Sequence, residues 1–173
     1  ICNNVFIDKT DVSGMKSTQA KAAIEKKLEE YGAITVGLEA EEVKAEVLLS
    51  ELGFQMKDVD KLVKKAVSYG KKGGVWSRYS LIKDLEEEAK VFDAVFAVDA
   101  QLVEKVIAEK IPELKNAAKD ATITRQNDAF VITDEVKGVA VDVDESVKTI
   151  EKYFNTEWSY DTGNIKLVTK VDE

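Results

Sequence analysis

The chain alternates between segments with a two-residue hydrophobic period and segments with a period near 3.6. Residues 42–49 carry an apolar side chain at every second position, which is typical of a half-buried strand. Residues 58–70 carry them at i, i+3, i+4, i+7 and i+8, which predicts an amphipathic helix ending at Gly70. Most of the expected strands lack the long crossover that parallel neighbours need. We therefore expect an α+β fold with four to six helices and mixed, mainly antiparallel strands.

The same two periods predict a strand, a helix and a strand in succession at each end of the chain, that is, β-α-β units at both ends. Ser17, Asp58, Asp99 and Asp144 are the expected helix caps. The other expected boundaries are strands at 4–9, 33–38, 91–98, 139–141 and 165–171, helices at 17–31 and 78–88, and hairpin arms at 121–124 and 130–133.

No linker rich in proline, glycine or serine divides the 173 residues. The only seam is the rise in charge at residues 39–42, between two expected strands. We therefore expect a β-α-β lead-in over residues 1–40 and an α+β domain over residues 41–173.

The chain has no histidine and a single cysteine, Cys2. It thus lacks the usual base for neutral pH, the commonest metal ligand and any Ser-His or Cys-His nucleophile pair. The acidic run at 142–145 lacks the spacing and the central glycine of a calcium loop. We expect no catalytic residue, no metal and no cofactor. A hydrolase built on carboxylates is the least favoured hypothesis, and it would need two acids converging in a cleft.

The chain carries 25 basic and 33 acidic residues, a net charge of −8, which argues against a nucleic-acid partner. Its longest uncharged stretch is the eight residues 31–38, whereas a bilayer span needs about 20. We expect no membrane contact within this segment. Because the chain begins at Ile1 and not at Met, we expect a part of a longer protein, with an anchoring segment upstream.

A basic cluster surrounds the glycine-rich loop at residues 70–74, and two aromatic residues and an arginine follow it. The candidate ligand-binding residues are Lys71, Lys72, Trp76, Arg78 and Tyr79. If the rings are exposed, they could stack on sugars while the cations bind carboxylates of a peptide. In the alternative interpretation the lysines are the solvated face of a helix, and the rings anchor the loop to the core.

Several short motifs, in order along the chain, resemble one family of extracytoplasmic proteins. They are Val5–Met15 followed by Ala20, Ser50–Gly53, Tyr69–Gly70 with Gly73, Asp120–Thr122, and Gly138 with Asp142. The chain resembles the "putative peptidoglycan-binding domain" of VanW-like proteins and of L,D-transpeptidases from Gram-positive bacteria. It departs from the family pattern at Lys16, where a threonine cap is usual, and at Lys71, where an arginine is frequent.

The resemblance implies a non-catalytic accessory module, outside the membrane, that binds peptidoglycan for a longer cell-wall protein. The L,D-transpeptidase signature needs a histidine beside a cysteine, and the chain has no histidine. The resemblance also leaves a second interpretation open. In it the chain is a spacer that positions a downstream VanW-like or L,D-transpeptidase domain without binding glycan.

Overall fold

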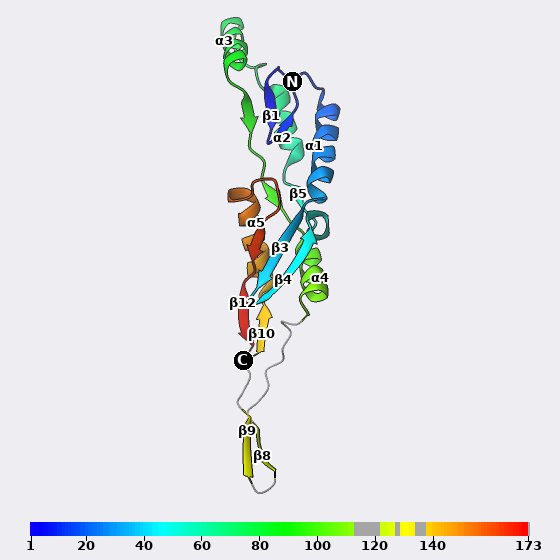
Figure 1. The fold of residues 1–173 in the computed structure, drawn as a ribbon. Helices are drawn as coiled ribbons and strands as arrows, with labels where there is room; N and C mark the ends of the chain where they lie inside the picture. Colours follow the sequence, from blue (N-terminus) through cyan, green and yellow to red (C-terminus); the bar gives the residue numbers. More distant parts are fainter. Residues whose placement is uncertain (113–121, 127–128, 134–137, 173) are drawn as a thin grey trace. The chain divides into compact units, whose positions relative to one another are not determined.

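The chain passes three times between two packing units of the computed structural model. The structure describes residues 1–112, 122–126, 129–133 and 138–172 (Figure 1). Unit 1 comprises Ile1–Ala33 and Phe54–Ala97, and unit 2 comprises Ile34–Gly53 and Val98–Glu173. Within the described residues, no helix is long and apolar enough to cross a membrane. The division at residue 41 expected from the sequence stays a prediction.

Unit 1 is built on a three-stranded sheet with three helices. Strand β1 (Val5–Ile7) pairs antiparallel with β2 (Thr10–Asp11) and parallel with β6 (Lys90–Phe92). Strand β5 (Gln55–Met56) pairs antiparallel with β7 (Phe96–Ala97). The helices are α1 (Ser17–Gly32), α2 (Val59–Ser68) and α3 (Val75–Glu87). The core forms because the apolar sides of α1, α2 and β1 pack on one another, with Ile7, Ile24 and Val63 fully buried.

Unit 2 is built on a second three-stranded sheet and two helices. Strand β3 (Thr35–Ala40) pairs antiparallel with β4 (Val43–Leu48) and parallel with β11 (Asn164–Lys166). Strands β10 (Gly138–Val141) and β12 (Thr169–Asp172) form an antiparallel pair, as do β8 (Thr122–Gln126) and β9 (Ala129–Thr133). The two α-helices are α4 (Ala100–Lys110) and α5 (Val143–Thr156), and a short 3₁₀-helix, η1 (Leu49–Leu52), follows β4. Leu38, Leu52 and Ile150 are fully buried in its core.

The predicted fold class is confirmed. The described residues contain five α-helices, and antiparallel strand pairs outnumber parallel ones. A strand, a helix and a strand follow one another at both ends of the chain, as expected. In each succession the two flanking strands pair with strands from elsewhere in the sequence, for example β1 with β6 and β3 with β4 and β11.

The predicted central strand over 91–98 is wrong. The segment forms two short strands, β6 and β7, which pair with β1 and β5 respectively. Between them the chain changes partner, and Val95 there is 51% exposed, while Val91 within β6 is 45% exposed. The predicted strand over 165–171 divides in the same way, because β11 pairs with β3 and β12 pairs with β10.

Of the expected helix caps, Asp99 is confirmed. Its carboxylate accepts hydrogen bonds from the backbone N–H groups of Gln101 and Leu102, at 2.9 and 3.2 Å. Asp58 directly precedes α2, as expected, but its side chain does not cap the helix. The residue has a left-handed backbone conformation, and its carboxylate pairs with Lys61 instead.

The other two expected caps are displaced along the chain. Helix α1 is capped at Lys16 and not at Ser17, and the Gln19 side chain accepts a hydrogen bond from the Lys16 N–H. Helix α5 is capped by Asp142 and not by Asp144, because Asp142 accepts the hydrogen bond from Glu145 N. An acidic residue correctly indicates that a helix begins nearby. Which residue caps the helix depends on its spacing to the free backbone N–H groups of the first turn.

Candidate functional site

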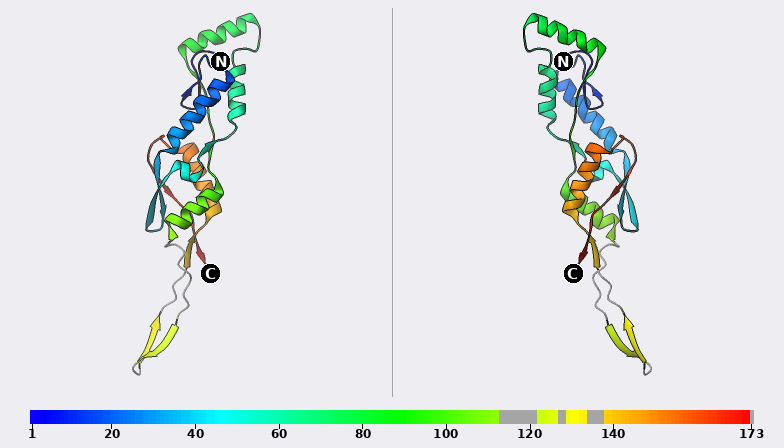
Figure 2. Two further views of the ribbon diagram at one scale, coloured as in Figure 1. Left: turned by 90° about the vertical axis from the view of Figure 1, so that its right-hand side faces the viewer. Right: turned by 90° about the vertical axis from the view of Figure 1, so that its left-hand side faces the viewer.

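Helix α3 carries the sequence-predicted aromatic residues at the end of unit 1. In Figure 2 it stands apart from α1 and α2 and is joined to α2 by the turn at residues 69–74. The helix begins at Val75, directly after its cap Gly74, and not at Arg78 as the sequence predicted. Leu85 is its only buried residue, and Asn4 Nδ2 donates a 2.8 Å hydrogen bond to the Leu85 carbonyl oxygen. Trp76 therefore lies on a helix and not in a loop.

The aromatic rings of α3 face solvent. Trp76 is 85% exposed and Tyr79 is 63% exposed, and Val75 and Ile82 on the same helix are 79% and 48% exposed. Spacings of three and four residues place these side chains along one side of the helix. The interpretation in which the two rings anchor the loop to the core is therefore wrong. Exposed apolar side chains grouped in this way are typical of contact surfaces.

The predicted basic residues do not all lie on the same side of α3 as the aromatic rings. Lys71 and Lys72 lie exposed in the turn that leads into α3. Arg78 is also exposed, but two residues of helix place it about 160° around the axis from Trp76. Lys83, which follows Trp76 by seven residues and Tyr79 by four, lies on the aromatic side instead.

We call Val75, Trp76, Tyr79, Ile82 and Lys83 the α3 surface. Val75, Ile82 and Lys83 were missing from the predicted site. A helical period counted from Val75 would have found them, but the two preceding glycines indicated a loop. The segment between Asp60 and Asp84 contains seven basic residues and no acidic one, although the whole chain is acidic. The α3 surface itself therefore combines apolar area with one cation, Lys83, and it lies in a segment with a local excess of positive charge.

Another side of α3 borders a polar hollow of about 790 Å³, which we call the α3–β6 hollow. Its polar and aromatic lining consists of Tyr69, Ser77, Ser80, Asp84, Glu88 and Lys90. A second hollow of about 490 Å³ lies between α3 and the start of the chain, against Ile82 and Leu85. Neither hollow is lined by Trp76, Arg78 or Tyr79.

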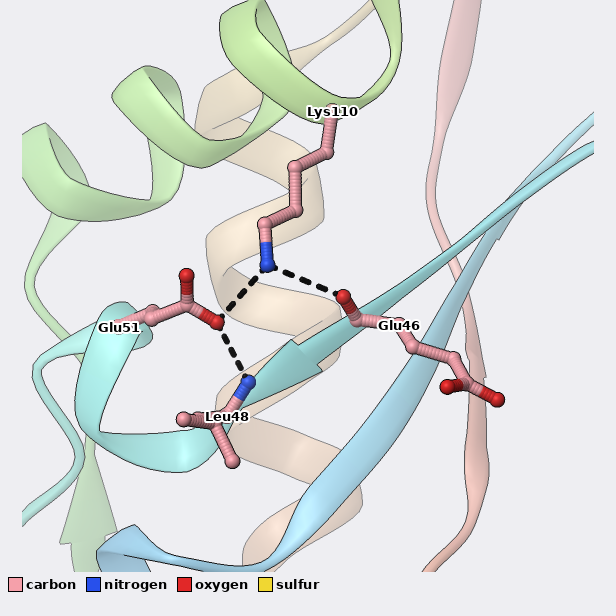
Figure 3. Close-up of polar contacts among 4 residues, drawn as sticks. All are labelled: Glu46, Leu48, Glu51 and Lys110. Carbon is pink, nitrogen blue, oxygen red and sulfur yellow. Dashed lines mark hydrogen bonds and ion pairs between the residues drawn. The ribbon is translucent and has the colours of Figure 1, made fainter.

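Part of the motif Ser50–Gly53 stabilises unit 2 (Figure 3). Glu51 Oε2 accepts hydrogen bonds from Leu48 N at 2.8 Å and from Lys110 Nζ at 2.9 Å. Lys110 Nζ also donates to the carbonyl oxygen of Glu46 at 3.1 Å. The Leu48 N–H, and then the Lys110 ammonium, hold the pKa of Glu51 below its ordinary value. These contacts connect α4 to η1 and β4.

Two glycines of the matching motifs are required by close approach. Gly53 has φ +66°, and a Cβ there would lie 2.7 Å from the Cβ of Asp99. Gly70 has φ +75°, and a Cβ there would lie 2.7 Å from Cys2 Sγ. The Cys2 thiol donates to the Tyr69 carbonyl oxygen at 3.3 Å, which helps to hold the turn before α3. These motif residues therefore serve the fold.

The residues of the first motif, Val5–Met15, also serve the fold. Val12 is fully buried in unit 1, and the Asp11 carboxylate accepts a 2.9 Å hydrogen bond from Ser13 N. Hydrogen bonds from Ser13 lower the pKa of Asp11. Asp120 and Ala121, the start of another motif, lie outside the described residues. In the part of the chain that the structure describes, no group of three or more acidic or cysteine side chains could hold a metal ion.

Comparison with known families identifies the family to which the chain belongs. The model of the family described as "Putative peptidoglycan binding domain" matches residues 45–157, more than half of the chain. The chain belongs to this family. The peptidoglycan-binding family match starts within β4 and ends just after α5, so it includes the α3 surface and the α3–β6 hollow. Searches of curated proteins and of solved structures gave no match.

Proposed function

We propose that the chain is a non-catalytic accessory module that binds peptidoglycan through the α3 surface together with Lys71 and Lys72. The observation that carries this proposal is the exposure of Trp76 and Tyr79 side by side on α3, within a chain of the peptidoglycan-binding family. Arg78 belongs to the proposed site as predicted from the sequence, but it lies on a different side of the helix, and we expect it to contribute least.

The chemistry of the surface fits a polymer of sugars and peptides. An indole and a phenol ring offer flat apolar area with a polar edge, which suits the faces of sugar rings. The ammonium groups of Lys71, Lys72 and Lys83 suit the carboxylates of a peptide stem as mobile point charges. A contact made by one helix and one turn leaves the cores of both units unchanged, so binding needs no rearrangement of the fold.

In this proposal the module acts outside the cytoplasmic membrane, at the cell wall, and holds a longer protein there. The anchor of that protein lies upstream of this segment, and its catalytic or VanW-like domain lies downstream. The module supplies attachment, and the chemistry belongs to the downstream domain.

Co-sedimentation with purified, insoluble cell-wall sacculi tests the proposal. The unaltered chain should be enriched in the pellet, and the double variant Trp76→Ala/Tyr79→Ala should bind at least about tenfold more weakly, since two stacked rings are lost. Circular dichroism should show that the variant keeps its fold, because both side chains are exposed. An unaltered chain that stays in the supernatant would contradict the proposal.

A charge-matched comparison tests the lysines. Lys71→Ala/Lys72→Ala should weaken pelleting, whereas Lys166→Ala/Lys170→Ala removes the same charge from exposed positions of unit 2 and should not. Equal losses in the two variants would mean that only the net charge of the chain matters, and not the surface at α3.

The second candidate function is a spacer that sets the distance of a downstream domain and binds no glycan. It is favoured by one observation, that Trp76 and Tyr79 lie on the outside of a helix and line neither neighbouring hollow. A spacer predicts that an unrelated folded domain of similar length can replace this chain in the parent protein. A module that binds the wall predicts that this exchange releases the parent from the wall.

A further inference from the structure

The polar side of α3 faces the α3–β6 hollow, while its aromatic side faces solvent. Ser77, Ser80 and Asp84 follow one another at spacings of three and four residues, so they form a single stripe along the helix. Glu88, the residue directly after α3, lines the same hollow. An ordinary surface helix turns such a stripe outward and buries its apolar side. In α3 both sides are exposed, and the polar stripe forms one wall of a hollow whose volume is in the range of sites for small molecules and short peptides.

The charges in this hollow are unpaired. Among the described residues, the carboxylates of Asp84 and Glu88 have no hydrogen-bond or ion-pair partner. On the β6 side, Lys90 Nζ lies 5.9 Å from the centre of the Tyr69 ring and 5.6 Å from that of Phe92. It therefore contacts two rings and no carboxylate of the described chain. The hollow thus presents two negative charges on one wall and one positive charge on the other.

We propose that the α3–β6 hollow binds a short peptide that carries both a primary ammonium group and a carboxylate. The ammonium lies between Asp84 and Glu88, and the carboxylate lies at Lys90, so that each charge gains a charge-assisted hydrogen bond. A neutral ligand would remove water from the two carboxylates without compensating their charge, which is unfavourable. The hydroxyl groups of Ser77 and Ser80 are placed to bind the peptide backbone between the two ends.

This inference rests on the proposed function, because in peptidoglycan such groups belong to the peptide stem. With side chains a helix is about 10–12 Å across, so one helix can lie between a glycan strand and the peptide attached to it. The α3 surface would then contact the sugars and the hollow would receive the peptide. This arrangement gives both exposed sides of α3 a role, the apolar side in contact with sugars and the polar side in contact with the peptide.

The test uses the full chain and a synthetic peptide, N-acetyl-Ala-Lys-Ala, with its C-terminal alanine in either the L or the D form. This peptide has one ammonium and one carboxylate. Titration calorimetry should show saturable binding of at least one form. Acetylating the lysine Nε, or amidating the C-terminus, should weaken binding at least about tenfold, because each change removes one charge-assisted hydrogen bond.

Matched variants locate the site. Asp84→Asn/Glu88→Gln should weaken peptide binding at least about tenfold. Glu86→Gln/Glu87→Gln removes the same charge from the same helix at positions that do not line this hollow, and it should change binding less than about twofold. Lys90→Met retains an apolar stem against the two rings, so it should fold and yet lose the discrimination between free and amidated peptide. Thermal melts confirm that each variant is folded.

Four outcomes would overturn the inference. They are absence of peptide binding, equal affinity for the Nε-acetylated peptide, equal losses in the two acidic pairs, and binding at the hollow of a neutral chitin oligosaccharide in place of the peptide. Two results separate this inference from the proposed function. A chain that pellets with sacculi but binds no peptide overturns the inference alone. A chain that binds peptide at the hollow but does not pellet overturns the proposed function alone.

Discussion

Replacing Glu51 should destabilise unit 2 and leave wall binding unchanged. In Glu51→Ala, Leu48 N loses the acceptor at the start of η1, which typically costs about 1 kcal/mol. The half-exposed ion pair with Lys110 adds at most about 1 kcal/mol. We therefore expect a loss of about 1–2 kcal/mol for Glu51→Ala. Glu51→Gln keeps an acceptor for Leu48 N and loses only the charge, so it should cost less than about 1 kcal/mol.

The effect of Glu51 should depend on pH in one direction. Its pKa in the folded chain is held below the ordinary value of 4.5, first by the Leu48 N–H and then by Lys110. A lowered pKa means that the charged form stabilises the fold above pH 4.5, and that this stabilisation is lost as the pH falls through the folded value. Wild type and Glu51→Gln should therefore differ at pH 7 and converge in acid.

Urea unfolding followed by the fluorescence of Trp158 measures these differences. Trp158 is 7% exposed in unit 2, and its Nε1 donates to the Asp161 carbonyl oxygen at 2.9 Å. The background variant Trp76→Phe removes the only other tryptophan. Lys110→Met should resemble Glu51→Gln, whereas Lys105→Met, at an exposed position on the same helix, should have little effect. A cost below about 0.3 kcal/mol for Glu51→Ala, or a pH-independent difference for Glu51→Gln, would refute this reasoning.

Three further changes test other parts of the fold. Gly53→Ala should destabilise the chain by at least about 2 kcal/mol in urea unfolding, because φ is +66° and the new Cβ would overlap a neighbouring side chain; a neutral effect would contradict the close approach. Ser146→Ala should cost about 1–3 kcal/mol, because the fully buried hydroxyl accepts from Val168 N at 3.0 Å and that N–H would lose its partner; retained stability would show that another group replaces it. Burial, and then Asp8, raise the pKa of Tyr31, so its neutral form stabilises the fold below pH 10 and this stabilisation falls as the pH rises further. Tyr31→Phe should remove that alkaline loss from the thermal melting curve, and an unchanged pH profile would count against the assignment.

Elements with one partner and one clear period could be predicted from the sequence. The alternation around Val47 identifies β4, and the helical spacing around Leu62 and Val63 identifies α2. In both, local pattern and final packing agree, because each element has a single apolar side that is buried against one neighbouring layer. Asp99 could be predicted as a cap from its place directly before a helical period. The same reasoning was wrong for Asp58, whose left-handed backbone leaves its carboxylate to pair with Lys61.

Elements whose chain changes partner could not be predicted in this way. Residues 91–98 are apolar apart from Asp93, which is typical of one buried strand, but the chain leaves β1 and joins β5 within this segment, and Val95 between the two strands is exposed. Local hydrophobicity does not record which distant segment supplies the hydrogen bonds. The split between β11 and β12 has the same cause.

Residue types alone suggested the candidate site, whereas its geometry could not be predicted from the sequence. The aromatic and basic residues were predicted together, but the start of α3 was placed three residues late. With a helix start at Arg78, Val75 and Ser77 fall outside the helix. The apolar stripe of Val75 and Ile82 and the polar stripe of Ser77 and Asp84 therefore could not be recognised. Only the structure shows that the polar stripe borders a hollow closed by Lys90, because β6 arrives there through its pairing with β1.

The most direct test of the central claim is the fluorescence of Trp76 itself. In Trp158→Phe it is the only indole, and at 85% exposure its emission should be that of a solvated ring. Titration with soluble peptidoglycan fragments should shift this emission to shorter wavelength in a saturable way and protect it from an added quencher. Unchanged emission from Trp76, in a chain that nevertheless sediments with sacculi, would show that the wall is bound elsewhere.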